Sequence, residues 1–192
     1  MDRPSPEAGD QPTVATAAVR EQQWTRSAPW IAAGIALAVL AVDQLSKAWA
    51  EATLRAGVRV PLLGDALGIK LIYNPGAAFS IGTGFTWIFT LAAAAAVGVG
   101  VWFTWRVRSR AWAICLGLLV GGATTHLLDR LFRPPSFGQG HVVDFIAYFD
   151  WFIGNVADIA LFAGAVTLLV VSALGLALRP APAARDRPAV GP

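Results

Sequence analysis

Charged residues, cysteine and histidine are all scarce in this chain. Only 14% of its 192 residues are charged and 56% are hydrophobic, whereas an ordinary soluble domain has roughly 25% charged residues. A single cysteine excludes an internal disulfide, and the two histidines leave no Cys/His spacing for a zinc or iron–sulfur site. The composition therefore predicts a membrane protein and argues against metal chemistry, and we expect no cofactor.

A strong net charge is also absent. The formal net charge is +3, and the arginines are scattered instead of forming the concentrated basic patch of a nucleic-acid-binding protein. We therefore expect no nucleic-acid partner. The basic residues are expected to orient the chain in a membrane.

Four apolar segments are long enough to predict transmembrane helices. They cover residues 29–48, 84–105, 111–128 and 155–178. Arginines lie between the second and third segments and near the outer ends of the set, so the positive-inside rule makes those regions cytoplasmic. Seven of the eight tryptophans lie near the predicted span ends, as interfacial belts require.

The remaining segments divide into tails and loops around one membrane domain, residues 28–178. Residues 1–27 and 179–192 are polar or Pro-rich and are expected to be disordered cytoplasmic tails. In the first outer loop, residues 50–83, the alternation in GIKLIYN predicts short strands of a small sheet. The aromatic second loop, residues 131–154, predicts an interfacial loop or helix. The expected fold class is a mainly α membrane protein with four transmembrane helices and a small extracytoplasmic β-sheet.

Three aspartates fall at one depth near the outer ends of the spans. An aspartate at a helix centre costs roughly 2.5 to 3.5 kcal/mol on insertion scales, and less near the interface. Asp43 precedes Lys47 by four residues on one helical face, which predicts a structural ion pair. Asp129 ends the third span and Asp158 begins the fourth. Because consecutive antiparallel helices usually pack together, we expect these two carboxylates to face each other.

Two facing carboxylates in a partly dry site share one proton and supply one acid and one base. This is the arrangement of aspartic proteases, which activate water without a metal. Proton relays and substrate counter-ions use similar intramembrane acids. A transporter would need polar residues through the full bilayer depth, and the second and fourth spans offer almost none.

Five ordered blocks carry a family resemblance. They are DQLSK (residues 43–47), NPGAAFS (74–80), GGA (121–123) leading to Asp129-Arg130, VVDF (142–145) and NVAD (155–158). In order and spacing they resemble the bacterial lipoprotein signal peptidases, the signal peptidase II family. The resemblance implies a membrane aspartic endopeptidase that removes the signal peptide from diacylglyceryl-modified prolipoproteins, cutting just before the lipidated cysteine.

The resemblance also implies the setting of the reaction. The chain would lie in the bacterial cytoplasmic membrane with both termini cytoplasmic and its active site facing outward. Its partners would be lipidated prolipoproteins and membrane lipids, and we expect a monomer. A non-catalytic or reduced-activity relative that binds lipidated peptides is the alternative.

Residue roles follow from the same blocks. The catalytic pair would be Asp129 and Asp158, with either one protonated at rest. Supporting roles would fall to Asn74 and Asn155, which can hydrogen-bond substrate backbone, and to Arg130, which could orient Asp129 or neighbouring carbonyls. The remaining matched residues are Gly76, small enough for close backbone approach or a simple turn, and Asp43, Lys47 and Asp144 as structural or supporting groups.

The chain departs from the family pattern at two places. Thr125 and His126 stand where Gly-Asn is usual, and Ile153-Gly154 precedes Asn155 where phenylalanine is more usual beside the asparagine. His126 could donate a hydrogen bond in place of the missing asparagine, or be satisfied at the interface by water or backbone. The departures favour a divergent paralogue with narrowed substrates or reduced activity.

Overall fold

The computed structural model describes residues 24–76 and 84–180, so most of both predicted tails lies outside the described residues. Within the described ranges, four helices are long and apolar enough to cross a membrane. They are α2 (Ala28–Thr53), α3 (Thr86–Thr104), α4 (Arg110–Phe132) and α5 (Val156–Ala173). The four predicted spans are confirmed, with α2 and α4 extending further toward the sheet than expected.

Helix α4 is the centre of the bundle, packing against α2, α3 and α5. Small residues allow its close approach to two of them. A Cβ on Gly121 would come within 2.8 Å of Val39 Cβ on α2, and one on Gly122 within 3.0 Å of the Ala157 carbonyl oxygen on α5. The glycines therefore let helices approach where apolar surface alone gives no net drive for association in lipid.

Both outer loops contribute to one antiparallel sheet of order β1-β2-β3-β4. Strands β1 (Val60–Leu63) and β2 (Leu67–Asn74) come from the first loop, as predicted, and β3 (Val142–Tyr148) and β4 (Phe152–Gly154) from the second. Part of the segment expected to be an interfacial loop or helix is thus strand. Val143 and Phe145 alternate inward onto Ala50 of α2, so burial of this face favours the strand over an interfacial segment.

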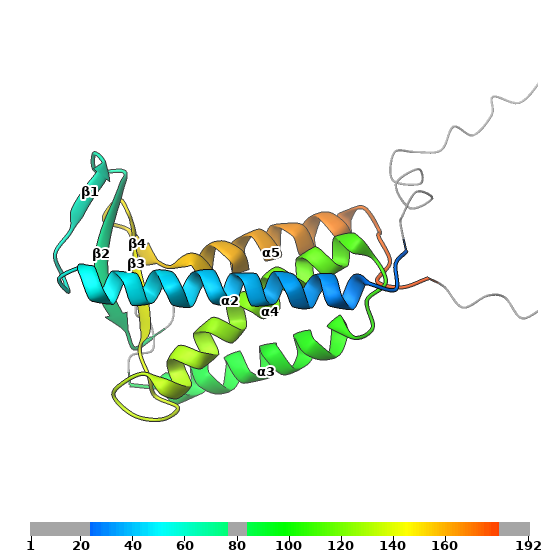
Figure 1. Cartoon of the computed structure of the whole chain (residues 1–192), viewed down its shortest axis with the longest axis horizontal. Coiled ribbons are helices and arrows are strands. Elements are labelled where there is room, and N and C mark those ends of the chain that lie inside the picture. The colour runs from blue at the N-terminus through cyan, green and yellow to red at the C-terminus, as the bar shows by residue number, and fades with distance from the viewer. Residues whose placement is uncertain (1–23, 77–83, 181–192) are drawn as a thin grey trace, which may run out of the picture.

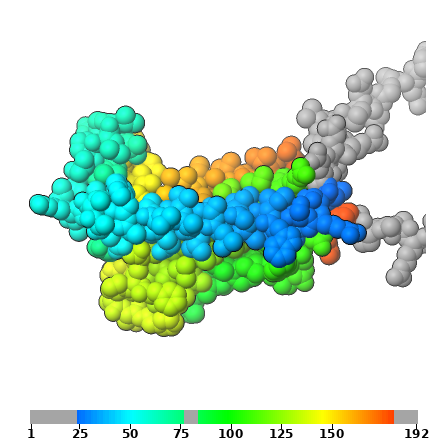
Figure 2. Space-filling view, viewed as in Figure 1, coloured from blue at the N-terminus to red at the C-terminus, as the bar shows by residue number. Residues whose placement is uncertain are grey.

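The sheet lies at one end of the bundle, and the first and last described residues lie at the other (Figure 1). At the end away from the sheet, Thr25 N donates to Arg108 O at 2.7 Å, and Arg108 N donates to Leu178 O at 2.9 Å. The last residues of the first predicted tail are therefore bonded to the α3–α4 link. At the sheet end, Figure 2 shows the β1–β2 hairpin and the segment after α4 projecting on opposite sides of α2. The aspartates and asparagines of the five sequence blocks lie together at the sheet end of the bundle.

Candidate active site

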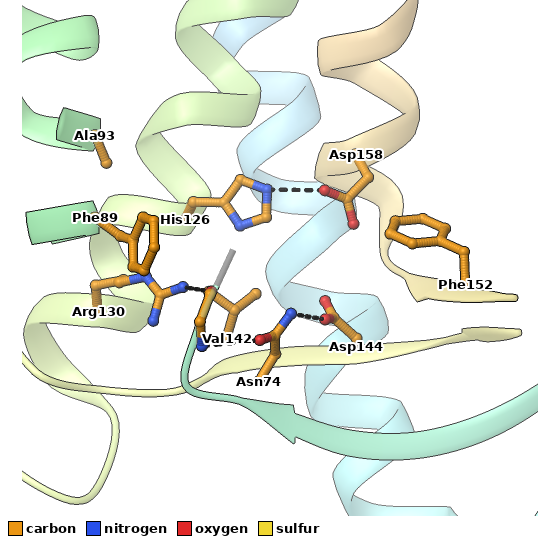
Figure 3. Close-up of a pocket in the computed structure, with 10 residues that line it drawn as sticks. Asn74, Phe89, Ala93, His126, Arg130, Val142, Asp144, Phe152 and Asp158 are labelled. Carbon is orange, nitrogen blue, oxygen red and sulfur yellow. Dashed lines mark hydrogen bonds and ion pairs between the residues drawn. The ribbon is translucent and has the colours of Figure 1, made fainter. Parts of the chain in front are cut away.

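A pocket of about 200 Å³ lies where α3, α4 and α5 meet the sheet. Figure 3 shows its polar side chains pointing toward one another from four different elements. Two carboxylates, one imidazole and one guanidinium face apolar walls from α3 and β4. The lining residues are Asn74, Gly76, Phe89, Ala93, His126, Arg130, Val142, Asp144, Phe152 and Asp158.

Asp158 is held in place by the start of α5. Asn155 is the N-cap of this helix: its side chain accepts a hydrogen bond from Asp158 N at 3.1 Å, and Asp158 Oδ2 accepts one from Asn155 N at 2.9 Å. This reciprocal capping box is a local consequence of the Asn-x-x-Asp spacing. It leaves Asp158 Oδ1 directed at the pocket, with 30% of the side chain exposed.

Asp144 reaches the same pocket from β3. It lies opposite Ile72 of β2, on the strand face away from the Val143 and Phe145 core. Its Oδ1 accepts a hydrogen bond from Asn155 Nδ2 at 2.6 Å, and its Oδ2 accepts one from Asn74 Nδ2 at 3.1 Å. The two asparagines that the blocks single out therefore bind Asp144 in this structure.

The environment of Asp144 favours its protonated form. Burial, and next the negative charge of Asp158, raises the pKa of Asp144 from 3.8 to about 6. The hydrogen bond from Asn74 and the charge of His126 oppose this rise only in part. A carboxyl whose pKa is raised by a neighbouring carboxylate can supply the acid of a pair that needs one acid and one base.

Asp129 lies elsewhere, which corrects the expected pairing of Asp129 with Asp158. It is buried, with Oδ2 at 2.7 Å from Lys47 Nζ and Oδ1 at 2.7 Å from Arg133 Nε. Gln44 Nε2 also donates to Oδ1 at 3.1 Å, and Val143 N to Oδ2 at 3.3 Å. With these partners on both oxygens, Asp129 does not line the pocket.

The physical reason is the helical row on which each side chain sits. Gly121, Thr125 and Asp129 are spaced by four along α4, and Gly121 packs on α2. Gly122 and His126 form the adjacent row, and Gly122 packs on α5. The last turn of α4 therefore directs Asp129 to α2 and presents His126 to Asp158.

The predicted pair of Asp43 and Lys47 forms, with Lys47 Nζ 2.6 Å from Asp43 Oδ2 and both side chains fully buried. The second Asp43 oxygen accepts a hydrogen bond from Ala157 N at 2.9 Å. Asp43 thus satisfies a free amide at the N-terminus of α5, where a negative charge is favourable. We call Asp43, Lys47, Asp129 and Arg133 the ion-pair cluster; its role in holding α2, α4 and α5 together is structural.

Arg130 donates hydrogen bonds to backbone carbonyl oxygens rather than to Asp129. Its guanidinium donates to the carbonyl oxygens of Pro75 at 3.1 Å, Gly140 at 3.2 Å and Gly76. Asn74 Oδ1 accepts a hydrogen bond from Gly76 N at 3.0 Å. Together these contacts fix the end of the β2 loop at the pocket rim; the rest of the NPGAAFS block, from Ala77 to Ser80, lies outside the described residues.

His126 was expected to donate a hydrogen bond in place of the family's usual asparagine. In the structure its partner is Asp158. Its Nε2 lies 3.2 Å from Asp158 Oδ1, and 20% of its side chain is exposed. Of the predicted site residues, the structure brings together Asn74, Gly76, His126, Arg130, Asn155, Asp158 and Asp144 at or beside one pocket. It separates from them Asp129, Asp43 and Lys47.

The chain is similar in sequence to proteins of one family. The family described as signal peptidase (SPase) II matches residues 35–174. A lipoprotein signal peptidase of Rhodococcus jostii is 46% identical over 142 residues, covering 74% of this chain and 72% of that protein. Those of Leifsonia xyli and Mycobacterium avium are 45% and 44% identical, covering 76% and 73% of this chain and 69% and 78% of their own lengths.

The fold also has solved counterparts. Two structures described as bacterial membrane enzymes superimpose with TM-scores of 0.69 and 0.64 at 22% and 24% identity. They cover 85% and 79% of this chain, and 99% and 96% of their own. At that identity the likeness concerns the fold alone, whereas the match over residues 35–174 and the curated relatives establish kinship. The chain is a multi-pass membrane protein that belongs to the signal peptidase II family of peptidases.

Proposed function

We propose that this chain is an aspartic endopeptidase that removes the signal peptide from diacylglyceryl-modified prolipoproteins, cutting just before the lipidated cysteine, with Asp144 and Asp158 as its catalytic pair. One observation carries the proposal. Two carboxylates from separate elements, β3 and α5, line one pocket, and the charge of one helps to raise the pKa of the other.

The two environments assign the roles. Asp158, partly exposed, takes a proton from water as the water oxygen attacks the scissile carbonyl carbon, and Asp144 gives its proton to the carbonyl oxygen. The tetrahedral intermediate then breaks at the C–N bond. Asp158 passes its proton to the leaving amine, and the intermediate returns a proton to Asp144, so that both groups end as they began.

A lipidated substrate is supported by a second cavity. A separate apolar cavity of about 550 Å³ is lined by residues of α3, α4 and α5. Ala96, Ala123 and Leu161 line it, and each is three residues, about one helical turn, from a residue that lines the catalytic pocket. Acyl chains on the cysteine next to the scissile bond would fit this apolar cavity.

The membrane orientation is part of the proposal. Arg106, Arg108 and Arg110 lie at the end of the bundle away from the sheet, which the positive-inside rule makes cytoplasmic. The first and last described residues, Trp24 and Pro180, lie toward that end as well (Figure 1). The pocket at the sheet end then faces outward, at the depth where the lipidated cysteine of a precursor lies.

The test uses the full chain in proteoliposomes with a diacylglyceryl-modified precursor. Asp144→Asn and Asp158→Asn are expected to insert and remain folded but release no signal peptide. Asp150→Asn is the matched control, because Asp150 follows β3 in the same loop but is 95% exposed and pairs with Arg59. Normal turnover by either pocket variant would reject the catalytic pair, and equal cleavage of an unlipidated precursor would reject the substrate class.

A further inference from the structure

One of the two histidines of the chain lies inside the candidate active site. His126 Nε2 is 3.2 Å from Asp158 Oδ1 and both side chains are partly buried. The other histidine, His141, lines a separate cavity with Glu51 and Arg133. The mechanism above uses two carboxylates and gives no task to the imidazole that contacts one of them.

The contact completes the support of Asp158. Oδ2 is already held by Asn155 N at 2.9 Å, so His126 fixes the remaining oxygen (Figure 3). When the imidazole is protonated, this contact is a charge-assisted hydrogen bond, which is about twice as strong as a neutral one. Protonated His126 therefore favours the carboxylate form of Asp158 and leaves the proton of the pair on Asp144.

Few other ionisable groups of the described residues face His126. Asp158 approaches it from α5, Asp144 from β3 and Arg130 from its own helix, while β2 presents the neutral Asn74. The α3 and β4 walls are Phe89, Ala93 and Phe152. On α2, Asp43 and Lys47 bind each other, and Asp43 also accepts a hydrogen bond from Ala157 N. The charged groups around His126 are thus two carboxylates, Asp144 and Asp158, and one permanent cation, Arg130.

We propose that His126 is a positioning residue for the peptidase reaction: in its protonated form it holds Asp158 as the carboxylate base and so extends cleavage to more acidic pH. This inference rests on the proposed function. It adds a third ionisable group, on α4, to a site whose two acids come from β3 and α5, and it assigns a consequence to the replacement of asparagine by histidine at this position.

The test is the pH dependence of kcat/KM for the lipidated precursor in proteoliposomes, for the parent, His126→Asn and His126→Gln. Both variants carry neutral amides, and an opposite charge at this range shifts carboxyl titration by about one pH unit or more. The acid limb of the profile is expected to move to higher pH by about one unit, a loss of roughly tenfold on that limb. The alkaline limb, which reports loss of the Asp144 proton, is expected to move to higher pH as well, because the charge of His126 lowers the pKa of Asp144. His141→Asn is the matched control and should reproduce the parent profile.

Two results overturn the inference. In the first, the acid limb of every folded variant coincides with that of the parent. In the second, kcat/KM falls by the same factor at all pH values, as a merely structural role would produce. Either amide variant suffices, since each removes the charge while retaining a donor. Asp158→Asn in the same assay separates the inferences: if it still cleaves, the catalytic pair fails, and if it is inactive while the His126 limbs coincide, only this inference fails.

Discussion

The sheet end of the bundle holds two sets of carboxylates in opposite electrostatic settings. In the ion-pair cluster, each aspartate has a cation at 2.6 or 2.7 Å and is buried. In the pocket, Asp144 has only amide donors within hydrogen-bond distance and Asp158 has a histidine and a backbone amide. Neither of these two has a Lys or Arg ion pair among the described residues.

The difference shows how one chain separates structure from chemistry using the same side chain. A carboxylate whose two oxygens are both held by fixed cations has no free oxygen to offer to a water or a carbonyl, so Asp129 suits neither acid nor base. A buried carboxyl without such cations keeps its proton to higher pH, as Asp144 does. Proximity to the site is therefore a weaker guide to catalysis than the charge of the immediate partners.

The largest effect expected from this comparison is on turnover. Asp144→Asn removes the group that protonates the scissile carbonyl, and loss of one member of a catalytic unit lowers kcat by a thousandfold or more, on the order of 10³ to 10⁶. Binding of a lipidated precursor should persist, because this substitution leaves the apolar cavity unchanged. Single-turnover cleavage and precursor crosslinking measure the two separately. Loss of binding in step with loss of cleavage would mean that Asp144 supports the pocket and does not act in the reaction.

The next largest effect is a loss of stability, and it is expected for a residue of the ion-pair cluster. Asp129→Asn removes a charge that contacts both Lys47 and Arg133, and breaking a buried ion pair costs roughly 3 to 5 kcal/mol. The low end, about 3 kcal/mol, is expected because Lys47 keeps Asp43 and Arg133 keeps Glu51. Unfolding in mixed micelles measures the loss, with Asp158→Asn for comparison. If Asp129→Asn is as stable as the parent but inactive, Asp129 acts in the reaction and the assignment of Asp144 and Asp158 as the catalytic pair is wrong.

A pH-dependent stability effect distinguishes Asp144 from the cluster. The folded pKa of Asp144, about 6, lies above its ordinary value of 3.8, so the stability that its proton contributes is present below pH 3.8 and lost as pH rises through 6. Replacing it with neutral Asn removes that loss. Relative to the parent, Asp144→Asn should therefore gain about 2 kcal/mol between pH 4 and pH 8.

Thermal unfolding of both proteins in detergent across this range gives the measurement. Altered hydrogen bonds to Asn74 and Asn155 shift the variant by a similar amount at each pH, so the change with pH isolates the ionisation. A difference that stays constant from pH 4 to pH 8 would show that Asp144 titrates in its ordinary range.

The fold was largely predictable because its signals are local. Apolar runs set the four spans, and alternation in GIKLIYN set β2. The capping role of Asn155 toward Asp158 is also readable, as an Asn-x-x-Asp spacing before an apolar run. These features need no knowledge of which elements become neighbours.

The proposed catalytic partner of Asp158 was not predictable from local signals, because it depends on which elements pack together. Chain order made α5 the neighbour of α4, but α4 also packs on α2, and one step around the helix decides which neighbour Asp129 meets. Asp144 did leave a signal, a single acid between Val143 and Phe145 in an apolar run. Its meaning depends on β3 pairing with β2, some 70 residues earlier, which places it beside Asn74.

The smallest effect should come from Asp150→Asn, which tests whether setting rather than residue type governs the outcome. Asp150 is in the same loop as Asp144, but its carboxylate is 95% exposed and pairs at 2.7 Å with Arg59. Exposed pairs contribute little because water and salt screen them. Turnover, its pH profile and the unfolding midpoint should all match the parent. A loss of cleavage here, with stability intact, would place the β1–β2 hairpin that carries Arg59 in contact with the precursor, because Arg59 also donates to Phe149 O and Asp65 O and so ties that hairpin to the loop after β3.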